Sequence, residues 1–165
     1  MKSQKFVPEG CLVHPDTYWA NVMKGLDFSC PYGDAEEFTF SKLEGVELKA
    51  IYVDTFHDDR VYMLGANNKL YVLLHIQECC EDVYLGDIVG DVKDLLNTPI
   101  LMAEENIVDL VPDEYNESAT ATFYKLATIK GFVDIRFNGS SNGYYSEKAE
   151  CFVYDLNKYG SGKDI

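Results

Sequence analysis

The chain has 165 residues with 28 acidic and 14 basic side chains, so its formal net charge is −14. This length fits one domain with a real core, and a hydrophobic content of 47% excludes a disordered acidic polymer. The charge argues against direct nucleic-acid binding, which depends on Lys and Arg contacts to phosphates. The sequence contains neither an apolar run long enough to span a membrane nor a secretory signal at its start, so we expect a cytoplasmic protein without membrane contact.

Residues 1–41 form an irregular segment that contains Pro8, Pro15 and Pro31. Asp16 is a suitable N-cap for a short helix over residues 17–24. We expect this segment to be an N-terminal appendage, and residues 42–165 to form a single domain.

Short strands are predicted after residue 46. Residues 46–53 alternate, which places Val46, Leu48, Ala50 and Tyr52 on one side. Residues 60–64 and 69–76 are separated by a Gly-Ala-Asn-Asn connection, which is typical of a hairpin. The second of these strands is apolar on both faces, so we expect it to be central in its sheet.

A helix is predicted over residues 88–97. Ile88, Val92, Leu95 and Leu96 follow the spacing i, i+4, i+7 and i+8, which gives an apolar stripe. Asp87 is the expected N-cap, and the helix ends before Pro99. A strand is expected to follow over residues 99–105.

The last third of the chain has a strong β pattern. Residues 120–129 and 132–137 alternate and are joined by a turn at Lys130-Gly131. Residues 138–143 are polar and glycine-rich, which predicts a loop, and residues 144–154 return as the final strand. Together with the helix, this pattern predicts an α+β fold with a largely antiparallel sheet.

The negative charge is concentrated in residues 78–117, which hold 12 acids and one base, Lys93, for a net charge of −11. Such density predicts a solvated face, a surface that binds a basic partner, or a divalent cation site. The candidate partner-binding acidic surface consists of Glu78, Glu81, Asp82, Asp87, Asp91, Asp94, Glu104 and Glu105.

The five cysteines do not have the paired spacing of a zinc site, and free thiols are expected. His75, Cys79 and Cys80 are possible metal ligands, but adjacent cysteines in an extended chain point to opposite faces. Acidic neighbours such as Glu78 and Glu81 also raise the pKa of a thiol, which counts against a nucleophilic cysteine. We therefore expect no metal and no cofactor.

The polar loop and the start of the strand after it form a second candidate site, because binding groups are often placed on such loops. Arg136 and Lys130 are basic side chains near the loop in sequence, and His75 is a possible acid or base. The ligand-binding candidates are Lys130, Arg136, Asn142, Tyr144, Tyr145, Ser146 and His75. No P-loop, nucleophile elbow, zinc-protease helix or EF-hand is present, which leaves open whether the protein is an enzyme.

Two stretches carry a family resemblance. One is HIQECCEDVYLGDIVGDVKDLLNTPILMAEE at residues 75–105, and the other is TFYKLATIKGFVDIRFNGSSNGYYSE at residues 122–147. Across residues 42–153 the chain resembles an uncharacterised family of small acidic proteins of tailed bacteriophages and prophages. Ala121 and Phe137 stand where that family typically has Trp. The resemblance implies a phage setting and action in the host cytoplasm, but no established activity.

Three functional hypotheses follow, of which the third, a structural or housekeeping phage component, has no positive signal in the sequence. The first is an accessory protein that binds and inhibits a host factor with a basic surface, such as a defence system or a nucleic-acid enzyme. Against such an enzyme the protein would act as a nucleic-acid mimic. The alternative is a protein or enzyme that binds a small, nucleotide-like ligand with the region 136–147. The oligomeric state is left open.

Overall fold

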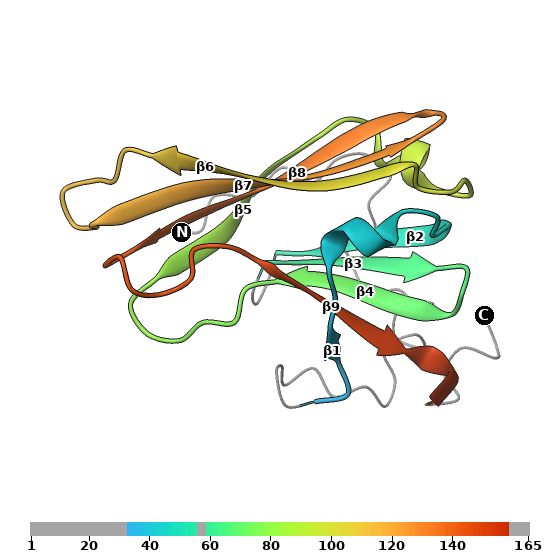
Figure 1. The fold of residues 1–165 in the computed structure, drawn as a ribbon, viewed down its shortest axis with the longest axis horizontal. Coiled ribbons are helices and arrows are strands. Elements are labelled where there is room, and N and C mark those ends of the chain that lie inside the picture. The colour runs from blue at the N-terminus through green and yellow to red at the C-terminus, as the bar shows by residue number, and fades with distance from the viewer. Residues whose placement is uncertain (1–32, 56–58, 159–165) are drawn as a thin grey trace.

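The computed structural model describes residues 33–55 and 59–158, which form two antiparallel sheets packed face to face (Figure 1). The predicted α+β class is wrong, because the described residues are nearly all antiparallel β and none of them belongs to a helix of seven residues or more. The strands are β1 (Glu36–Glu37), β2 (Leu48–Asp54), β3 (Arg60–Gly65), β4 (Lys69–Leu74), β5 (Asp82–Val89), β6 (Met102–Leu110), β7 (Ser118–Thr128), β8 (Gly131–Ser141) and β9 (Glu150–Asp155). Three short 3-10 turns complete the fold: η1 (Phe40–Leu43), η2 (Val92–Leu95) and η3 (Leu156–Lys158).

The first sheet has the strand order β1-β9-β4-β3-β2. The predicted β3–β4 hairpin and the central position of β4 are confirmed. The face predicted for β2 is only partly right, because a bulge between Leu48 and Ala50 shifts the register. Leu48 therefore packs in the core between the sheets, whereas Tyr52 packs on the opposite face.

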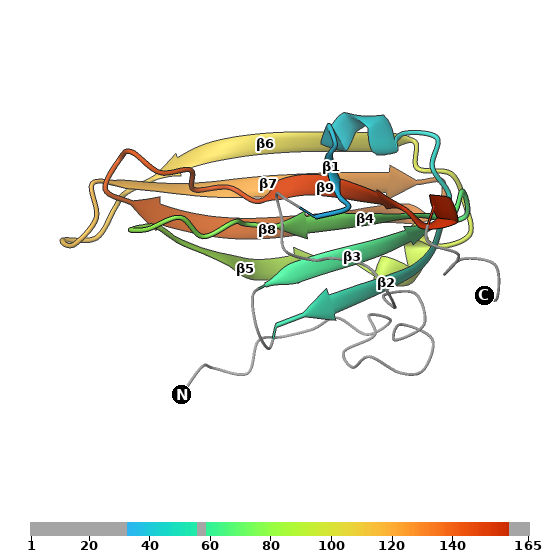
Figure 2. The ribbon, with the colours of Figure 1, turned by 90° about the horizontal axis from the view of Figure 1, so that it is seen from below.

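The second sheet has the order β5-β8-β7-β6, and its strands lie side by side in Figure 2. The predicted alternation in β7 and β8 is confirmed: Tyr124 and Leu126 pack inward with Val133 and Ile135, and Lys125 faces outward. The turn between these two strands lies at Ile129 and Lys130, one residue before the predicted Lys130-Gly131, and Gly131 begins β8. Sheet pairing therefore follows the period-2 pattern of the sequence.

The core fills the space between the two sheets. It contains Ile51, Val61, Met63, Tyr71 and Leu73 from the first sheet, with Leu85, Ile88, Tyr124, Leu126, Val133, Ile135 and Phe137 from the second. A further buried cluster, including Tyr62, Val72 and Tyr154, lies on the other face of the first sheet. The first sheet is thus buried on both faces, which explains why β4 is apolar on both sides.

The predicted helix over residues 88–97 is wrong. Ile88 lies within strand β5. The residue that caps the 3-10 turn η2 is Asp91 and not Asp87, because its side chain accepts a hydrogen bond from the Lys93 N–H at 3.0 Å. Gly90 has a φ of +106°, which breaks any continuous helix between β5 and η2. The apolar stripe predicted burial correctly, because Ile88, Val92 and Leu95 are all buried. They reach the core from a strand and a 3-10 turn and not from one helix.

The predicted loop over residues 138–143 and the strand over residues 144–154 are also misplaced. Strand β8 runs on through Ser141, and β9 does not begin until Glu150. The connection therefore covers residues 142–149. Its Asn-Gly pair at Asn142-Gly143 supplies the turn, with Gly143 at φ +85°, whereas Asn138-Gly139 is strand.

The structure describes only the end of the predicted N-terminal appendage, and the helix expected over residues 17–24 lies outside the described residues. In the described part, β1 pairs with β9, and Phe40 of η1 packs in the core. Among the described residues, no helix has the length and apolarity needed to cross a membrane.

We expect Gly90→Ala to lower the free energy of unfolding by about 2 kcal/mol or more, because the residue has a positive φ and a Cβ would lie 2.3 Å from the Phe132 carbonyl oxygen. In a helix the same change would stabilise the protein by about 1 kcal/mol. Urea unfolding measures the sign. Gly45→Ala is the control: Gly45 has a φ of +86° with no atom within 4 Å of the added Cβ, so the cost there is about 1 kcal/mol.

Candidate functional site

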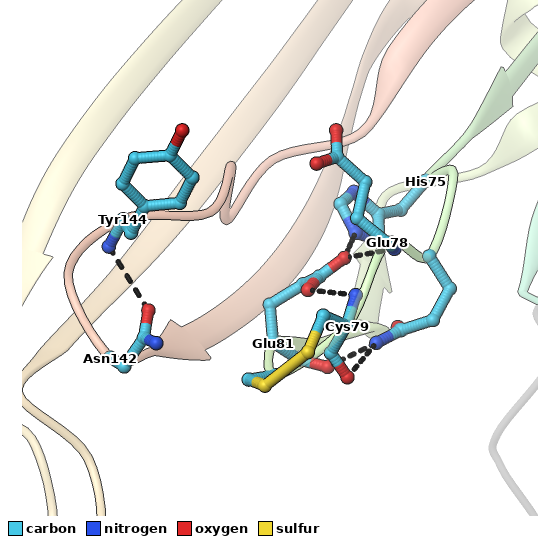
Figure 3. Close-up of a disulfide and its surroundings, with 8 residues drawn as sticks. His75, Glu78, Cys79, Glu81, Asn142 and Tyr144 are labelled. Carbon is cyan, nitrogen blue, oxygen red and sulfur yellow. Dashed lines mark hydrogen bonds and ion pairs between the residues drawn. A yellow bond between two sulfur atoms is a disulfide. The ribbon is translucent and has the colours of Figure 1, made fainter.

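The connection between β4 and β5 folds around the carboxylate of Glu81, whose side chain is fully buried. This carboxylate accepts hydrogen bonds from the Glu78 N–H at 2.6 Å and the Cys79 N–H at 3.0 Å (Figure 3). His75 Nε2 donates to it at 3.0 Å. Gln77 adds a bond from its amide to the Glu81 carbonyl at 2.6 Å. A tight loop over residues 75–81 follows from these bonds.

His75 joins this loop to the connection before β9, because its Nδ1 lies 2.9 Å from the Lys148 carbonyl oxygen. Both ring nitrogens of His75 therefore face acceptor oxygens, which fixes the orientation of the ring between the two connections. Its partner Glu81 is ionised: burial alone raises the pKa of that carboxyl, but the two backbone N–H groups and His75 outweigh burial and lower it to about 2. His75 and Glu81 thus form a buried ion pair rather than an acid–base pair open to a substrate.

Cys79 and Cys80 form a disulfide on this loop. The expectation of free thiols on opposite faces is therefore wrong here, because the chain bends at these residues instead of running extended. Cys151 is a buried free thiol, and burial with the nearby Glu105 raises its pKa to about 12, which makes it a poor nucleophile. Cys11 and Cys30 lie outside the described residues. No group of three or more possible metal ligands gathers within the described residues.

A small hollow of about 220 Å³ lies between the inner face of β7 and β8 and the connection 142–149. Gly139 allows this close approach, since a Cβ there would lie 2.1 Å from the Glu147 carbonyl oxygen. Glu147 is 9% exposed, and its carboxylate accepts hydrogen bonds from Ser118 Oγ at 3.0 Å and Ser141 Oγ at 2.7 Å. The lining residues are Ile107, Ser118, Thr120, Thr122, Ser141, Gly143, Tyr145, Ser146, Glu147 and Lys148.

A larger hollow of about 500 Å³ lies beside the first, and Lys148 lines both. Its walls include Phe38 and Phe40, with three carboxylates from Glu37, Glu105 and Glu150. Lys148 Nζ binds Glu105 at 3.0 Å. Burial raises the pKa of Glu150, and one of its carboxylate oxygens is buried without a hydrogen-bond partner among the described residues. The larger hollow is therefore negatively charged.

The predicted acidic residues do not form one patch. Three of them lie on the outer face of the second sheet beside cross-strand neighbours that include two bases: Asp82 is opposite Ser140, Asp87 opposite Arg136, and Glu104 opposite Lys125. Asp91 and Asp94 lie on the turn η2, and Glu78 is exposed on the 75–81 loop. Glu81 is buried in its ion pair, and Glu105 faces the larger hollow.

The structure also separates the ligand-binding candidates. Lys130 lies at the β7–β8 turn, where its Nζ donates to the Leu96 carbonyl at 2.7 Å, and Arg136 lies on the outer face of β8. Tyr145 and Ser146 line the small hollow. Asn142 and Tyr144 lie on the same connection near the disulfide loop, as Figure 3 shows, with the Tyr144 N–H donating to Asn142 Oδ1 at 3.1 Å. The two basic side chains are therefore not part of the hollow that the loop residues form.

Sequence reasoning missed the inner wall of the small hollow. Ser118, Thr120 and Thr122 have the same strand parity as the core residues Tyr124 and Leu126, so their polarity marks the point where the inner face stops being core. It also missed Glu147, whose two hydroxyl partners are 29 and 6 residues away in sequence. The available signal was the alternation of side chains in β7, which places these polar residues on the same face as the core residues.

A family model described as a domain of unknown function, DUF7448, matches residues 39–151. The chain belongs to the DUF7448 family. No curated protein and no solved structure matches the chain. The match spans η1 to the start of β9, so the DUF7448 domain includes both hollows apart from Glu37 and Phe38 at the rim of the larger one.

We expect Glu81→Gln to lower the free energy of unfolding at neutral pH by about 3 kcal/mol, because it removes a buried charged acceptor from three hydrogen bonds. The pKa of Glu81 falls from 4.5 to about 2 on folding, so its contribution is fully present above pH 4.5 and is lost as the pH falls toward 2. Denaturant unfolding from neutral to acid pH should therefore show a shallower acid loss in the variant than in the wild type.

The control for this test is Glu78→Gln, which changes an exposed carboxylate on the same loop. Its stability and its acid profile should match the wild type. Equal acid profiles for Glu81→Gln and the wild type would contradict the buried ion pair.

Proposed function

We propose that this protein is a binding protein whose strand β6 takes up a basic segment of another protein as an added strand. The observation that carries the proposal is that β6 is the last strand of its sheet, and no described strand pairs with its outer side. Natural edge strands are usually blocked by Lys, Pro or a bulge. The nine residues of β6 contain neither Lys nor Pro, and their pairing with β7 is regular throughout.

Exposed apolar side chains support docking at this edge. Ile107, Val108 and Leu110 are 55%, 48% and 44% exposed, and the loop after β6 adds Val111 at 94% and Tyr115 at 86%. Main-chain hydrogen bonds of an added strand would supply affinity, and these side chains would supply contact area.

Charge selects the partner. β6 carries Glu104, Glu105 and Asp109, and the following loop adds Asp113, Glu114 and Glu117. Antiparallel pairing of two β6 strands would set acid against acid, which disfavours a second copy as the occupant. A segment rich in Lys and Arg is complementary, and Glu105 extends the negative surface into the larger hollow.

The finer part of the proposal comes from the resemblance to phage proteins. We infer an accessory protein of phage type that acts in the host cytoplasm and inhibits a host factor with a basic surface, a defence system or a nucleic-acid enzyme being suitable targets. Strand addition would block such a factor by occupying the segment that contacts its own acidic ligand. Mimicry of nucleic acid then lies in the charge and not in the shape of the surface.

A second candidate function is the binding of a small ligand, favoured by the hollow that Tyr145 and Ser146 line. The nucleotide-like form of that hypothesis depended on Lys130 and Arg136. Both lie away from the hollow, so the lining itself must define the ligand.

We expect Val108→Lys to abolish capture of a basic partner, because it places a cation at the docking edge. Val89→Lys is the matched control: Val89 is 53% exposed on β5, the opposite edge of the same sheet. Immobilised wild type and both variants are exposed to bacterial lysate at low and high salt, and retained proteins are identified by mass spectrometry. A partner held by the wild type and Val89→Lys at low salt, and lost with Val108→Lys and at high salt, is the expected result.

Hydrogen exchange then locates the contact with the captured protein. We expect slower exchange in β6 and no change in β5. If the immobilised Val108→Lys and Val89→Lys variants retain the same lysate proteins, or if binding persists at high salt, the proposal is contradicted.

A further inference from the structure

We propose that the small hollow between β7, β8 and the connection 142–149 binds a neutral sugar ring. The inference rests on the second candidate function and names its ligand class. It uses different polar groups from docking at β6, although Ile107 of β6 also lines the hollow.

Charge at the hollow disfavours an anionic ligand. Glu147 lines it. Among the described residues that line it, Lys148 is the only cation, and its Nζ is bound to Glu105 at 3.0 Å. A phosphate would meet a buried carboxylate without a basic side chain to offset it. A neutral ligand avoids this cost.

The Glu147 carboxylate selects hydroxyl donors. Its oxygens each accept one hydrogen bond, from Ser118 and Ser141, which hold it in place. An ionised carboxyl has about four acceptor positions, so about two remain for a ligand. Hydroxyl groups on adjacent carbons of a sugar ring are donors at a spacing that one carboxylate can accept.

Thr122 supplies a buried hydroxyl that lacks a partner. The residue has no exposed surface, it lines the hollow, and its Oγ1 has no hydrogen bond within the described part of the chain. A buried hydroxyl without a partner is costly. A ligand hydroxyl can both donate and accept, so it can pair with Thr122 Oγ1 in either sense. This unpartnered group, separate from the carboxylate, points to a ligand that reaches the bottom of the hollow.

Size and aromatic surface complete the match. A hollow of about 220 Å³ is smaller than the roughly 300–1,000 Å³ of pockets for drug-sized ligands, so it fits one ring. Tyr145 lines the hollow, and its ring packs edge-on against Tyr144 at 5.1 Å between centroids. Tyr144 is 83% exposed. Aromatic rings beside hydroxyl and carboxylate groups suit a sugar, which presents C–H faces and O–H edges.

Saturation-transfer NMR on the full chain tests the proposal with free pentoses and hexoses, with nucleosides, and with the phosphates of both. We expect transfer from unphosphorylated sugar rings and none from the phosphates. The nucleoside arm shows whether the ring is recognised alone or as part of a nucleoside.

Thr122→Val is the deciding variant, because it keeps the side-chain volume and removes only the unpartnered hydroxyl. We expect about tenfold weaker sugar binding, and a stability of the unliganded protein that equals or exceeds the wild type because a costly unpartnered hydroxyl is removed. Thr98→Val is the matched control: Thr98 also has a buried, unpartnered Oγ1 but lies outside the hollow, so its affinity should equal the wild type.

The outcomes separate the two levels of the proposal. Preference for phosphorylated ligands would overturn the neutral-sugar inference and leave small-ligand binding standing. No transfer from any compound would overturn both. Sugar binding that Thr122→Val leaves unchanged would overturn the assignment to this hollow.

Discussion

The face-to-face burial of two sheets of unequal length governs this structure. β7 and β8 have 11 residues each, and β3, β4 and β9 have six. At the usual rise per residue these are about 36 Å against about 20 Å. The first sheet therefore cannot cover the whole inner face of the second. Tyr124, Leu126 and Ile135 lie where the sheets overlap and form core, whereas Ser118, Thr120 and Ser141 lie where the overlap ends.

The connection 142–149 covers the end of the longer sheet, and polar bonds hold it there. Glu147 is fixed by two serine hydroxyls, Tyr124 donates to the Ala149 carbonyl, and His75 bonds the Lys148 carbonyl. His75 is in turn held by Glu81, so the loop before β5 and the connection before β9 are tied together. The space under this connection is polar, because the connection contributes main-chain groups and hydrogen bonds there and not apolar side chains.

Local patterns identified strands β7 and β8 correctly. The alternation in β7 and β8 and the hairpin between them are short-range signals, and the structure has both. The helix prediction failed because Ile88, Val92 and Leu95 satisfy a helical spacing and also satisfy a strand followed by a tight turn. Gly90, in a conformation that L side chains rarely adopt, was the local evidence for the second solution.

The candidate site was harder to predict, because its groups meet across long sequence separations. Tyr145 and Ser146 were recognised from loop composition, but Thr122 and Ser118 read as ordinary strand residues. The acidic segment was recognised from its charge. The structure divides these acids among a buried ion pair, a sheet face with interleaved bases, a hollow and an edge strand. This division depends on strand parity and on which strand ends the sheet.

The sequence by itself determined the strand alternation, the hairpins, the apolar positions and the concentration of negative charge, because these depend on residue type and on neighbours a few positions away. Only the tertiary structure decided that β6 is an edge, that Glu81 is buried with His75, and that Thr122 faces a hollow with Glu147. Those outcomes depend on the order and relative length of strands in two sheets, and strand order is a property of pairing between residues distant in the chain.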